Sequence, residues 1–292
     1  MPQETPPSFE DVAFALPGGL SMRARLYRGG PKTLALCIPG LTRNARDFEE
    51  LAPKVAATGR DVLVVSLRGR DGSDDDPDFR NYFPPTYRDD VLAALDQHGA
   101  KEAVFIGTSL GGIVTMLTNH AAPERVRAAV LNDVGPALAP EGIARIAGYV
   151  GDGTAAPAPA ANLDEAAARI KAINDPAFPD ADDDFWRVFA RRTFKETADG
   201  RWTLDYDPNI ARALVENGPA PDLEPAFASL KDKPTLIVRG EISDLLTPPI
   251  IDDMRAAHPS FDYAEVPRVG HAPMLTEPAA WKALEAFLTK ID

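Results

Sequence analysis

Residues 103–112 read Ala-Val-Phe-Ile-Gly-Thr-Ser-Leu-Gly-Gly, an apolar run that leads into a serine with a glycine two positions away on either side. A helical pattern rich in Ala, Leu and Met follows. A strand-to-helix turn tight enough to push Ser109 out of a sheet edge leaves no room for side chains at 107 and 111, so glycine is needed at both. The stretch predicts a nucleophile elbow. Because the same pattern also occurs in plain glycine-rich turns, the rest of the chain must decide.

Composition narrows the class of protein. The 292 residues are 45% hydrophobic, enough for one large α/β domain or two small ones. A formal net charge of -13 disfavours nucleic acid and anionic lipid as partners. The first seven residues lack the pattern of a signal peptide and no apolar run is long enough for a membrane span, so we expect a cytoplasmic protein. With one cysteine and four scattered histidines, neither a disulfide nor a metal site is expected.

Apolar runs alternate with amphipathic segments along most of the chain, which predicts a mainly parallel sheet covered by helices on both faces. We expect an opening antiparallel hairpin before this alternation begins. The predicted strands are 9–15, 20–27, 33–38, 61–67, 103–106, 126–134, 235–240 and 261–266, and the predicted helices include 45–58, 86–98, 248–257 and 277–291.

The strand rhythm stops between about 135 and 230. Here the sequence offers helical segments such as 163–173 and 185–194, separated by Ala/Pro/Asp stretches such as 153–161. An insertion between sheet strands lies at the edge where the elbow is expected, so it is well placed to form a lid. We therefore predict a core of residues 1–135 and 231–292 and a helical cap of residues 136–230.

A serine nucleophile needs a histidine to take its proton. Three histidines follow Ser109 in the chain. His120 lies far along the helix that the elbow starts, and His258 ends a predicted surface helix. His271 lies in a loop between the last strand and the closing helix, where loops return to the carboxyl edge of the sheet. It is therefore the predicted base.

The histidine in turn needs a carboxylate, which should follow a strand at the same edge. Asp244 comes shortly after the strand at 235–240 and is our choice, ahead of Glu241, which we expect to pack beside the strand. Asp133, after the preceding strand, is the main competitor. Its other reading is a cap for the turn at 132–136.

An oxyanion hole is the third requirement. The loop Pro39-Gly40-Leu41-Thr42-Arg43 follows the first parallel strand, where backbone amides can face the elbow. We expect the N–H groups of Leu41 and Leu110 to be the donors, because two preorganised donors stabilise the negative charge that develops in acyl transfer.

With these loops the chain resembles the α/β-hydrolase superfamily from Phe9 to Ile291. The resemblance rests on the 38–42 and 67–73 loops, the elbow, the 239–244 segment and Val269-Gly270-His271. It implies a mostly parallel sheet of eight strands, a helical lid after the sixth, and a triad of Ser109, Asp244 and His271. One departure is Pro39, where many members carry histidine before the glycine of the oxyanion loop.

The nucleophile separates activities within the superfamily. Its haloalkane dehalogenases and epoxide hydrolases use aspartate at the elbow, and its prolyl aminopeptidase-like members show a different oxyanion loop. Hydrolysis of carboxylic esters or lactones of small to medium size, with no metal or organic cofactor, is therefore our expectation. Two alternatives stay open: a C–C bond hydrolase of ring-cleavage products, although those resemble Asn-Ser-Met-Gly-Gly at the elbow, and a non-catalytic ligand-binding homologue.

Substrate choice is expected to lie in the cap, and the sequence offers apolar and aromatic side chains there. The same side chains could equally form the interior of the cap. A small ester-like molecule is the expected partner of the site, and the chain could be a monomer or a homodimer. The candidate pocket residues are Ile146, Tyr149, Trp186 and Phe189, with Phe185 and Phe194 as further possibilities.

Overall fold

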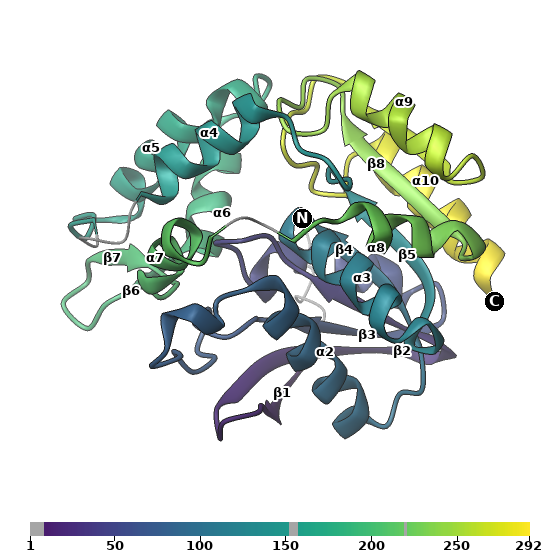
Figure 1. The fold of residues 1–292 in the computed structure, drawn as a ribbon. Helices are drawn as coiled ribbons and strands as arrows, with labels where there is room; N and C mark the ends of the chain where they lie inside the picture. Colours follow the sequence, from purple (N-terminus) through teal and green to yellow (C-terminus); the bar gives the residue numbers. More distant parts are fainter. Residues whose placement is uncertain (1–8, 152–156, 219–220) are drawn as a thin grey trace, which may run out of the picture.

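The structure, a computed structural model, describes residues 9–151, 157–218 and 221–292. The first seven residues and part of the 153–161 stretch considered above lie outside this range. In the described residues the main sheet has the order β1-β2-β4-β5-β8-β9, with β3 pairing with β2 (Figure 1). Its strands are β1 Glu10–Ala15, β2 Ser21–Ile38, β3 Arg60–Val65, β4 Ala103–Thr108, β5 Val126–Asn132, β8 Thr235–Gly240 and β9 Asp262–Val266.

The sheet is antiparallel at its start and parallel over the rest. Strand β2 pairs antiparallel with β1, and its first arm pairs antiparallel with β3, from Ala24 beside Val65 to Tyr27 beside Val62. The register of the second arm with β3 runs in the same direction, from Ala35 beside Val62 to Cys37 beside Val64, and every pair from β2 through β4, β5 and β8 to β9 is parallel. The opening hairpin and the parallel sheet predicted from the sequence are both present. Because parallel strands end at one edge, the residues that follow β2, β4, β5 and β8 are brought together there.

Strand β2 merges two predicted strands. The ranges 20–27 and 33–38 form one 18-residue strand whose pairing with β3 is irregular from Tyr27 to Cys37. Gly29 lies in this irregular stretch, where a Cβ would come within 2.2 Å of the carbonyl oxygens of Ala56 and Arg60. The glycine lets the chain pass close to the start of β3. The two arms of β2 lie on either side of β3 and take the places of two of the eight expected strands.

Helices cover both faces of the sheet (Figure 1), as the alternation predicted. On β4, Val104 and Ile106 face the cluster that includes α1 and α10, and Phe105 faces the cluster that includes α2, α3 and α9. This period of two is the expected geometry of a strand buried on both faces. The helices are α1 Leu51–Ala56, α2 Pro84–His98, α3 Leu110–Ala121, α9 Pro248–Ala257 and α10 Pro278–Ile291, with short 3-10 turns at Ala45–Phe48, Phe79–Asn81 and Pro123–Arg125.

The first predicted helix is corrected by the structure. Instead of one helix over 45–58, a 3-10 turn ends at Phe48 and α1 begins at Leu51. Asn44 explains the early turn, since its side chain accepts a hydrogen bond from the backbone N–H of Arg46.

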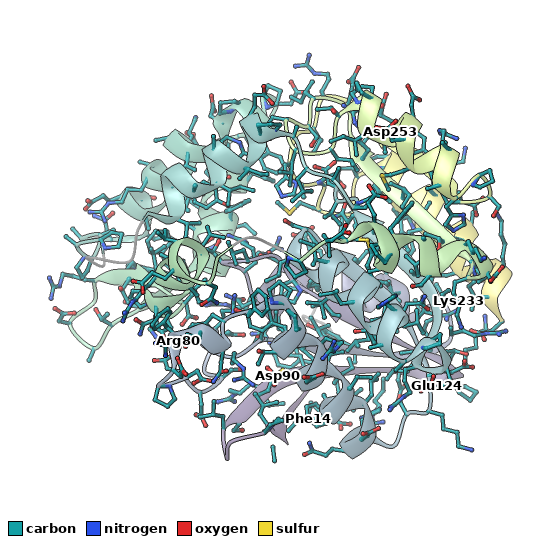
Figure 2. The ribbon with its side chains drawn as sticks, viewed as in Figure 1. Phe14, Arg80, Asp90, Glu124, Lys233 and Asp253 are labelled. Carbon is teal, nitrogen blue, oxygen red and sulfur yellow. The ribbon has the colours of Figure 1, made fainter. Side chains whose placement is uncertain are left out.

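Charged side chains such as Glu124 and Asp253 lie at the surface of the molecule, whereas Asp90 is fully buried (Figure 2) and is bonded to Arg68.

The chain between β5 and β8 is mostly helical, as expected, and holds an aromatic cluster of its own. It also contains a two-stranded hairpin that the sequence analysis missed, around the turn at Asp199-Gly200. Helix α8 packs on α3 beside the sheet (Figure 1), so the last residues of the predicted cap lie against the core. The elements are α4 Pro140–Val150, α5 Leu163–Asn174, α6 Asp183–Thr193, β6 Phe194–Glu196, β7 Trp202–Leu204, α7 Asn209–Glu216 and α8 Glu224–Ala228, with 3-10 turns at Asp175–Ala177 and Ser229–Asp232.

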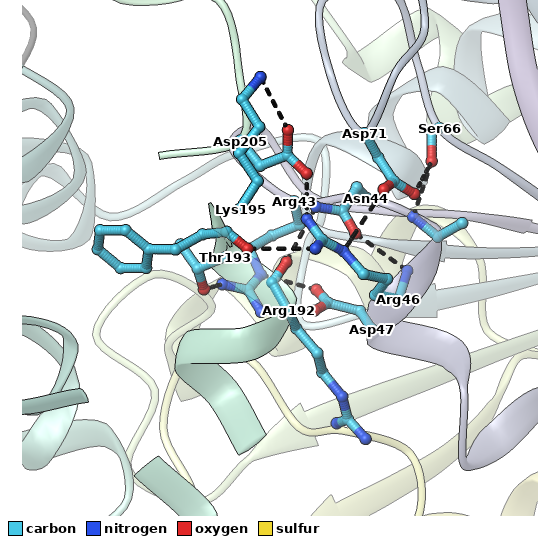
Figure 3. Close-up of polar contacts among 12 residues, drawn as sticks. Arg43, Asn44, Arg46, Asp47, Ser66, Asp71, Arg192, Thr193, Lys195 and Asp205 are labelled. Atoms are coloured by element: carbon cyan, nitrogen blue, oxygen red, sulfur yellow. Dashed lines mark hydrogen bonds and ion pairs between the residues drawn. The ribbon is translucent and has the colours of Figure 1, made fainter. Parts of the chain in front are cut away.

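Polar contacts join the end of α6 to the loop that follows β2 (Figure 3). The Asn44 side-chain amide donates to the carbonyl of Arg192 at 2.9 Å, and the guanidinium of Arg46 donates to the carbonyl of Phe194 at 3.2 Å. Arg46 also pairs with Asp205 next to β7. These contacts hold the loop after β2 against the inserted segment between β5 and β8.

Candidate active site

Ser109 sits in a sharp turn between β4 and α3. Its φ of 53° lies in the left-handed region, which is costly for a residue with a side chain. A Cβ on Gly107 would come within 2.3 Å of the Gly111 backbone, and one on Gly111 within 2.0 Å of the carbonyl oxygen of Ile38. The glycines are therefore required by contact, as the elbow pattern predicts.

Asn132, the last residue of β5, ties the elbow to the loop that carries His271. Its carbonyl accepts the Ser109 N–H at 3.0 Å. Its side-chain amide donates to Thr108 Oγ1 at 3.0 Å and to the carbonyl of Pro273 at 2.7 Å. Asn132 is fully buried, so these hydrogen bonds fix the two loops relative to each other.

His271 lies between a serine and an aspartate. Its Nε2 is 3.0 Å from Ser109 Oγ and its Nδ1 is 2.8 Å from Asp133 Oδ2. A carboxylate only accepts hydrogen bonds, so the ring proton lies on Nδ1 and leaves Nε2 free to accept the serine proton. The His271 side chain is 9% exposed and that of Asp133 is fully buried.

Asp244, the predicted partner of His271, does not hydrogen-bond to it. Its carboxylate makes a bidentate ion pair with Arg145 of α4, with oxygen-to-nitrogen distances of 2.6 and 2.8 Å. The hydrogen bond from Arg145 lowers the pKa of Asp244. The structure therefore brings Asp133, the competitor named above, and not Asp244 to His271, while the guanidinium of Arg145 binds the carboxylate of Asp244.

The surroundings of Asp133 explain why it can stay buried as a carboxylate. Its Oδ1 accepts the Gly240 N–H at 2.8 Å, and its Oδ2 accepts the Ser243 hydroxyl at 2.6 Å. Ser243 Oγ in turn accepts the N–H groups of Leu245 and Leu246 at 3.2 and 3.1 Å, which aims its single proton at Asp133. Sequence reasoning did not single out Ser243. Its place in the loop after β8 was the available signal.

The loop after β2 runs alongside the elbow. A Cβ on Gly40 would lie 3.7 Å from Ser109 Cβ, so the backbone of this loop lies next to the nucleophile. The carbonyl of Leu41 accepts two hydrogen bonds from buried Arg70, at 2.9 and 2.6 Å. Leu41 and Leu110 both line the cavity beside Ser109.

A cavity of about 1020 Å³ opens next to Ser109 and His271. Ile146, Tyr149 and Phe189, three of the four predicted pocket residues, are on its wall. Trp186 is not: it is 1% exposed and packs among Phe178, Phe185 and Phe189 in the interior of the inserted segment. The prediction for Trp186 is therefore wrong, because helical spacing alone does not tell the inner side of a cap from its cavity side.

No group of three or more His, Cys, Asp or Glu side chains among residues 9–151, 157–218 and 221–292 is arranged to hold a metal ion. Within the same residues, no helix is both long and apolar enough to cross a membrane.

A serine at a strand-to-helix turn, backed by a histidine and an aspartate from later loops of a mainly parallel sheet, defines the class of α/β hydrolases. The chain belongs to the alpha/beta hydrolase family, whose sequence model matches residues 35–284. The resemblance and the fold class predicted from the sequence are confirmed.

Individual relatives agree with this family. A solved structure of an α/β hydrolase from Novosphingobium aromaticivorans is 40% identical, has a TM-score of 0.89, and covers 97% of this chain and 98% of that one. The 3-hydroxybutyrate-oligomer hydrolase of Cupriavidus necator is 31% identical over 94% of both chains. The 2-(acetamidomethylene)succinate hydrolase of Mesorhizobium japonicum is 26% identical over 87% of this chain and 86% of its own.

Proposed function

We propose that this hydrolase cleaves carboxylic esters through an acyl-enzyme intermediate on Ser109. The observation that carries the proposal is the continuous hydrogen-bonded series from Ser109 Oγ through His271 to Asp133, at the wall of a large cavity. A serine hydroxyl is a weak nucleophile by itself and needs such a base. The helices between β5 and β8 serve as the cap over this site.

The geometry supports a two-stage reaction. As Ser109 Oγ bonds to the acyl carbon, its proton passes to His271 Nε2, and Asp133 stabilises the imidazolium through Nδ1. His271 then protonates the leaving alcohol as the bond between the acyl carbon and the alcohol oxygen breaks. A water molecule attacks the acyl-enzyme in the same way, giving its proton to His271, and the acid is released as Ser109 recovers its proton.

The oxyanion is assigned to the backbone N–H groups of Leu41 and Leu110. Leu110 is the first residue of α3, where backbone N–H groups have no partner within the helix. The two hydrogen bonds from Arg70 to the Leu41 carbonyl hold the opposite side of this pocket in place. Donors fixed before the reaction need no reorganisation when the negative charge develops.

One relative favours ester bonds over carbon–carbon bonds. The Cupriavidus necator relative is named for hydrolysing oligomers of 3-hydroxybutyrate, and hydroxy acids joined head to tail are joined by ester bonds. Its 94% coverage spans both the core and the inserted segment of this chain. Carbon–carbon bond hydrolysis and ligand binding without turnover are the outcomes that the following experiment must separate from ester hydrolysis.

The test is the pre-steady-state and steady-state release of 4-nitrophenol from 4-nitrophenyl acetate. We expect a burst followed by turnover in the wild type, and loss of both in Ser109→Ala and His271→Ala. His120→Ala is the matched control, since His120 is an exposed histidine in the last turn of α3. Equal, slow release by the wild type and Ser109→Ala would overturn the proposal and direct attention to carbon–carbon bond substrates and to ligand binding.

A further inference from the structure

We infer that this site, resting on the ester hydrolysis proposed above, takes esters with a long, uncharged apolar chain and rejects esters whose bound chain would place a free carboxylate inside the cavity. The chain would extend from Ser109 along the cavity to an opening between α4 and α7. Three observations carry this inference: the size of the cavity, the apolar residues at its opening, and the state of the charged groups on its wall.

The cavity is larger than a short ester needs. Binding sites for small molecules commonly measure about 300–1,000 Å³, and this one measures about 1020 Å³. Most of its wall is aliphatic or aromatic, which favours a ligand that brings apolar surface out of water. The apolar wall residues on the core side include Leu41, Leu110, Ile113, Val134 and Leu138, and those from the inserted segment include Ile146, Phe178 and Phe189.

The opening of the cavity is apolar as well. Ile143 on α4, and Leu214 and Val215 on α7, line the cavity and yet are 48%, 44% and 62% exposed. They are three of the five large hydrophobic side chains that are exposed in the described part of the chain. Because these residues both line the cavity and are open to water, a chain that leaves the cavity beside them would cover their exposed surface.

Arg43, the cationic side chain on the cavity wall, is already bonded to other side chains. Arg43 donates to both oxygens of Asp47, from Nε at 2.7 Å and from Nη2 at 2.5 Å, and its Nη1 donates to Thr193 (Figure 3). Its guanidinium also lies 4.1 Å from the centre of the Phe189 ring. The pair with Asp47 balances the charge of Arg43 and occupies the Nε–Nη2 edge, one of the edges on which a guanidinium binds a carboxylate bidentately.

No other lysine or arginine of the described cavity wall is free to bind a substrate carboxylate in place of Arg43. Arg145 on α4 is held by Asp244 in the bidentate ion pair described above. Among the described residues on the cavity wall, Arg43 is the sole Lys or Arg, and the segments 152–156 and 219–220 contain neither residue type in the sequence. The net charge of -13 adds a repulsive field. A substrate carboxylate would lose its water and gain no cation in return.

The first test compares chain lengths on both sides of the ester bond. We expect kcat/KM to rise by roughly fourfold per methylene from acetate to octanoate in 4-nitrophenyl esters, or along a series of alkyl acetates. A flat or falling profile in both series would overturn the inference. If acetate is still hydrolysed in a manner that depends on Ser109, the proposed function survives that failure, so the two failures are distinguishable.

The second test addresses the opening. Ile143→Ser should lower kcat/KM for the octanoate ester at least about fivefold more than kcat/KM for the acetate ester, because only the longer chain reaches α4. Ile242→Ser is a matched control: Ile242 is 45% exposed, close to the 48% of Ile143, but does not line the cavity. Equal effects of the two variants on octanoate would argue against a chain path past α4.

The third test addresses charge, with 4-nitrophenyl hydrogen adipate and 4-nitrophenyl hexanoate as an anionic and a neutral ester of equal chain length. The wild type should prefer hexanoate by at least tenfold. Asp47→Asn removes the charge that neutralises Arg43 and should shift this ratio about tenfold towards adipate. Asp47→Asn combined with Arg43→Gln should remove the gain. Equal use of the two esters by the wild type would overturn the exclusion of carboxylates.

Discussion

The loops after β5 and β8 begin alike and end in different environments. Each follows a parallel strand at the same edge of the sheet, and each carries an aspartate close to the strand end. Asp133 is fully buried and bonded to His271, whereas Asp244 is half-buried and bonded to Arg145. The two aspartates thus hold similar positions after their strands but bond to different side chains.

The difference shows that the end of a strand can place an aspartate near the site. The hydrogen-bond donors around each aspartate then determine which one contacts His271. The two loops also cooperate, because Gly240 and Ser243 from the second loop donate to the carboxylate of the first. A carboxylate that receives several hydrogen bonds can remain charged without access to water. The loop after β8 therefore supports the acid of the proposed triad and does not supply it.

Exchanging the buried aspartate should have the largest effect. Asp133→Asn should lower kcat on an ester substrate by roughly 10⁴-fold, because an amide does not stabilise the imidazolium and favours the wrong histidine tautomer. KM should change little, since Asp133 is not on the cavity wall. Steady-state kinetics and a thermal melt of the variant provide the measurement. A loss of less than tenfold in kcat would contradict the assignment of Asp133.

Removing the supporting hydroxyl should have an intermediate effect. Ser243→Ala leaves the buried carboxylate without its 2.6 Å donor, and hydrogen bonds to charged groups contribute about 1.5–3 kcal/mol. We expect kcat to fall about 10- to 100-fold with an unchanged KM, and Ser243→Thr, which keeps the hydroxyl, to recover most of it.

The control for Ser243 is another buried serine. Ser73 is 5% exposed, against 6% for Ser243, and its hydroxyl donates to the carbonyl of Ser66 at 2.6 Å, away from the cavity wall. Ser73→Ala should leave kcat within about twofold. If both alanine variants reduced kcat equally, Ser243 would have no special role in holding Asp133.

The half-exposed aspartate should have the smallest effect. Asp244→Asn should keep kcat within about threefold and lower the free energy of unfolding by less than about 1 kcal/mol at neutral pH, because water screens an ion pair that is partly open to solvent. Arg145 holds the pKa of Asp244 below its usual value. The carboxylate therefore stabilises the folded state above the ordinary aspartate pKa, and this contribution is lost as the pH falls through the lowered value.

The measurement is the difference in melting temperature between wild type and Asp244→Asn across the acidic range. This difference should shrink as the pH falls. A variant that instead lost catalysis as completely as Asp133→Asn would reverse the comparison between the two loops.

The sequence was sufficient to predict those features that depend on contacts between residues close in the chain. The elbow at Ser109 could be predicted because its two glycines meet backbone atoms at 2.0 to 2.3 Å, and no other residue type fits there. The place of His271 followed from the order of strands and loops. The opening hairpin, the parallel sheet and the helical insertion followed from the periodicity of apolar residues, which records burial directly.

Features that depend on distant partners could not be predicted. Whether Asp133 or Asp244 meets His271 depends on Arg145, which is about 100 positions before Asp244 in the chain. Trp186 and Phe189 share a helix and an aromatic character, and their different surroundings depend on how α5 and α6 pack. The continuity of β2 through Gly29 depends on the close approach of the chain at Ala56 and Arg60.

Cys37 gives the protein a built-in reporter of its own motions. It is the single cysteine, is fully buried in β2, and pairs with Val64 of β3 and Ile106 of β4. Burial raises the pKa of its thiol, so an alkylating reagent meets an unreactive, inaccessible group in the folded state. The rate of labelling then measures how often the centre of the sheet opens. Cys37 precedes Ile38, whose carbonyl oxygen packs against Gly111. The labelling rate of Cys37 therefore reports opening of the sheet one residue away from the backbone that supports the elbow.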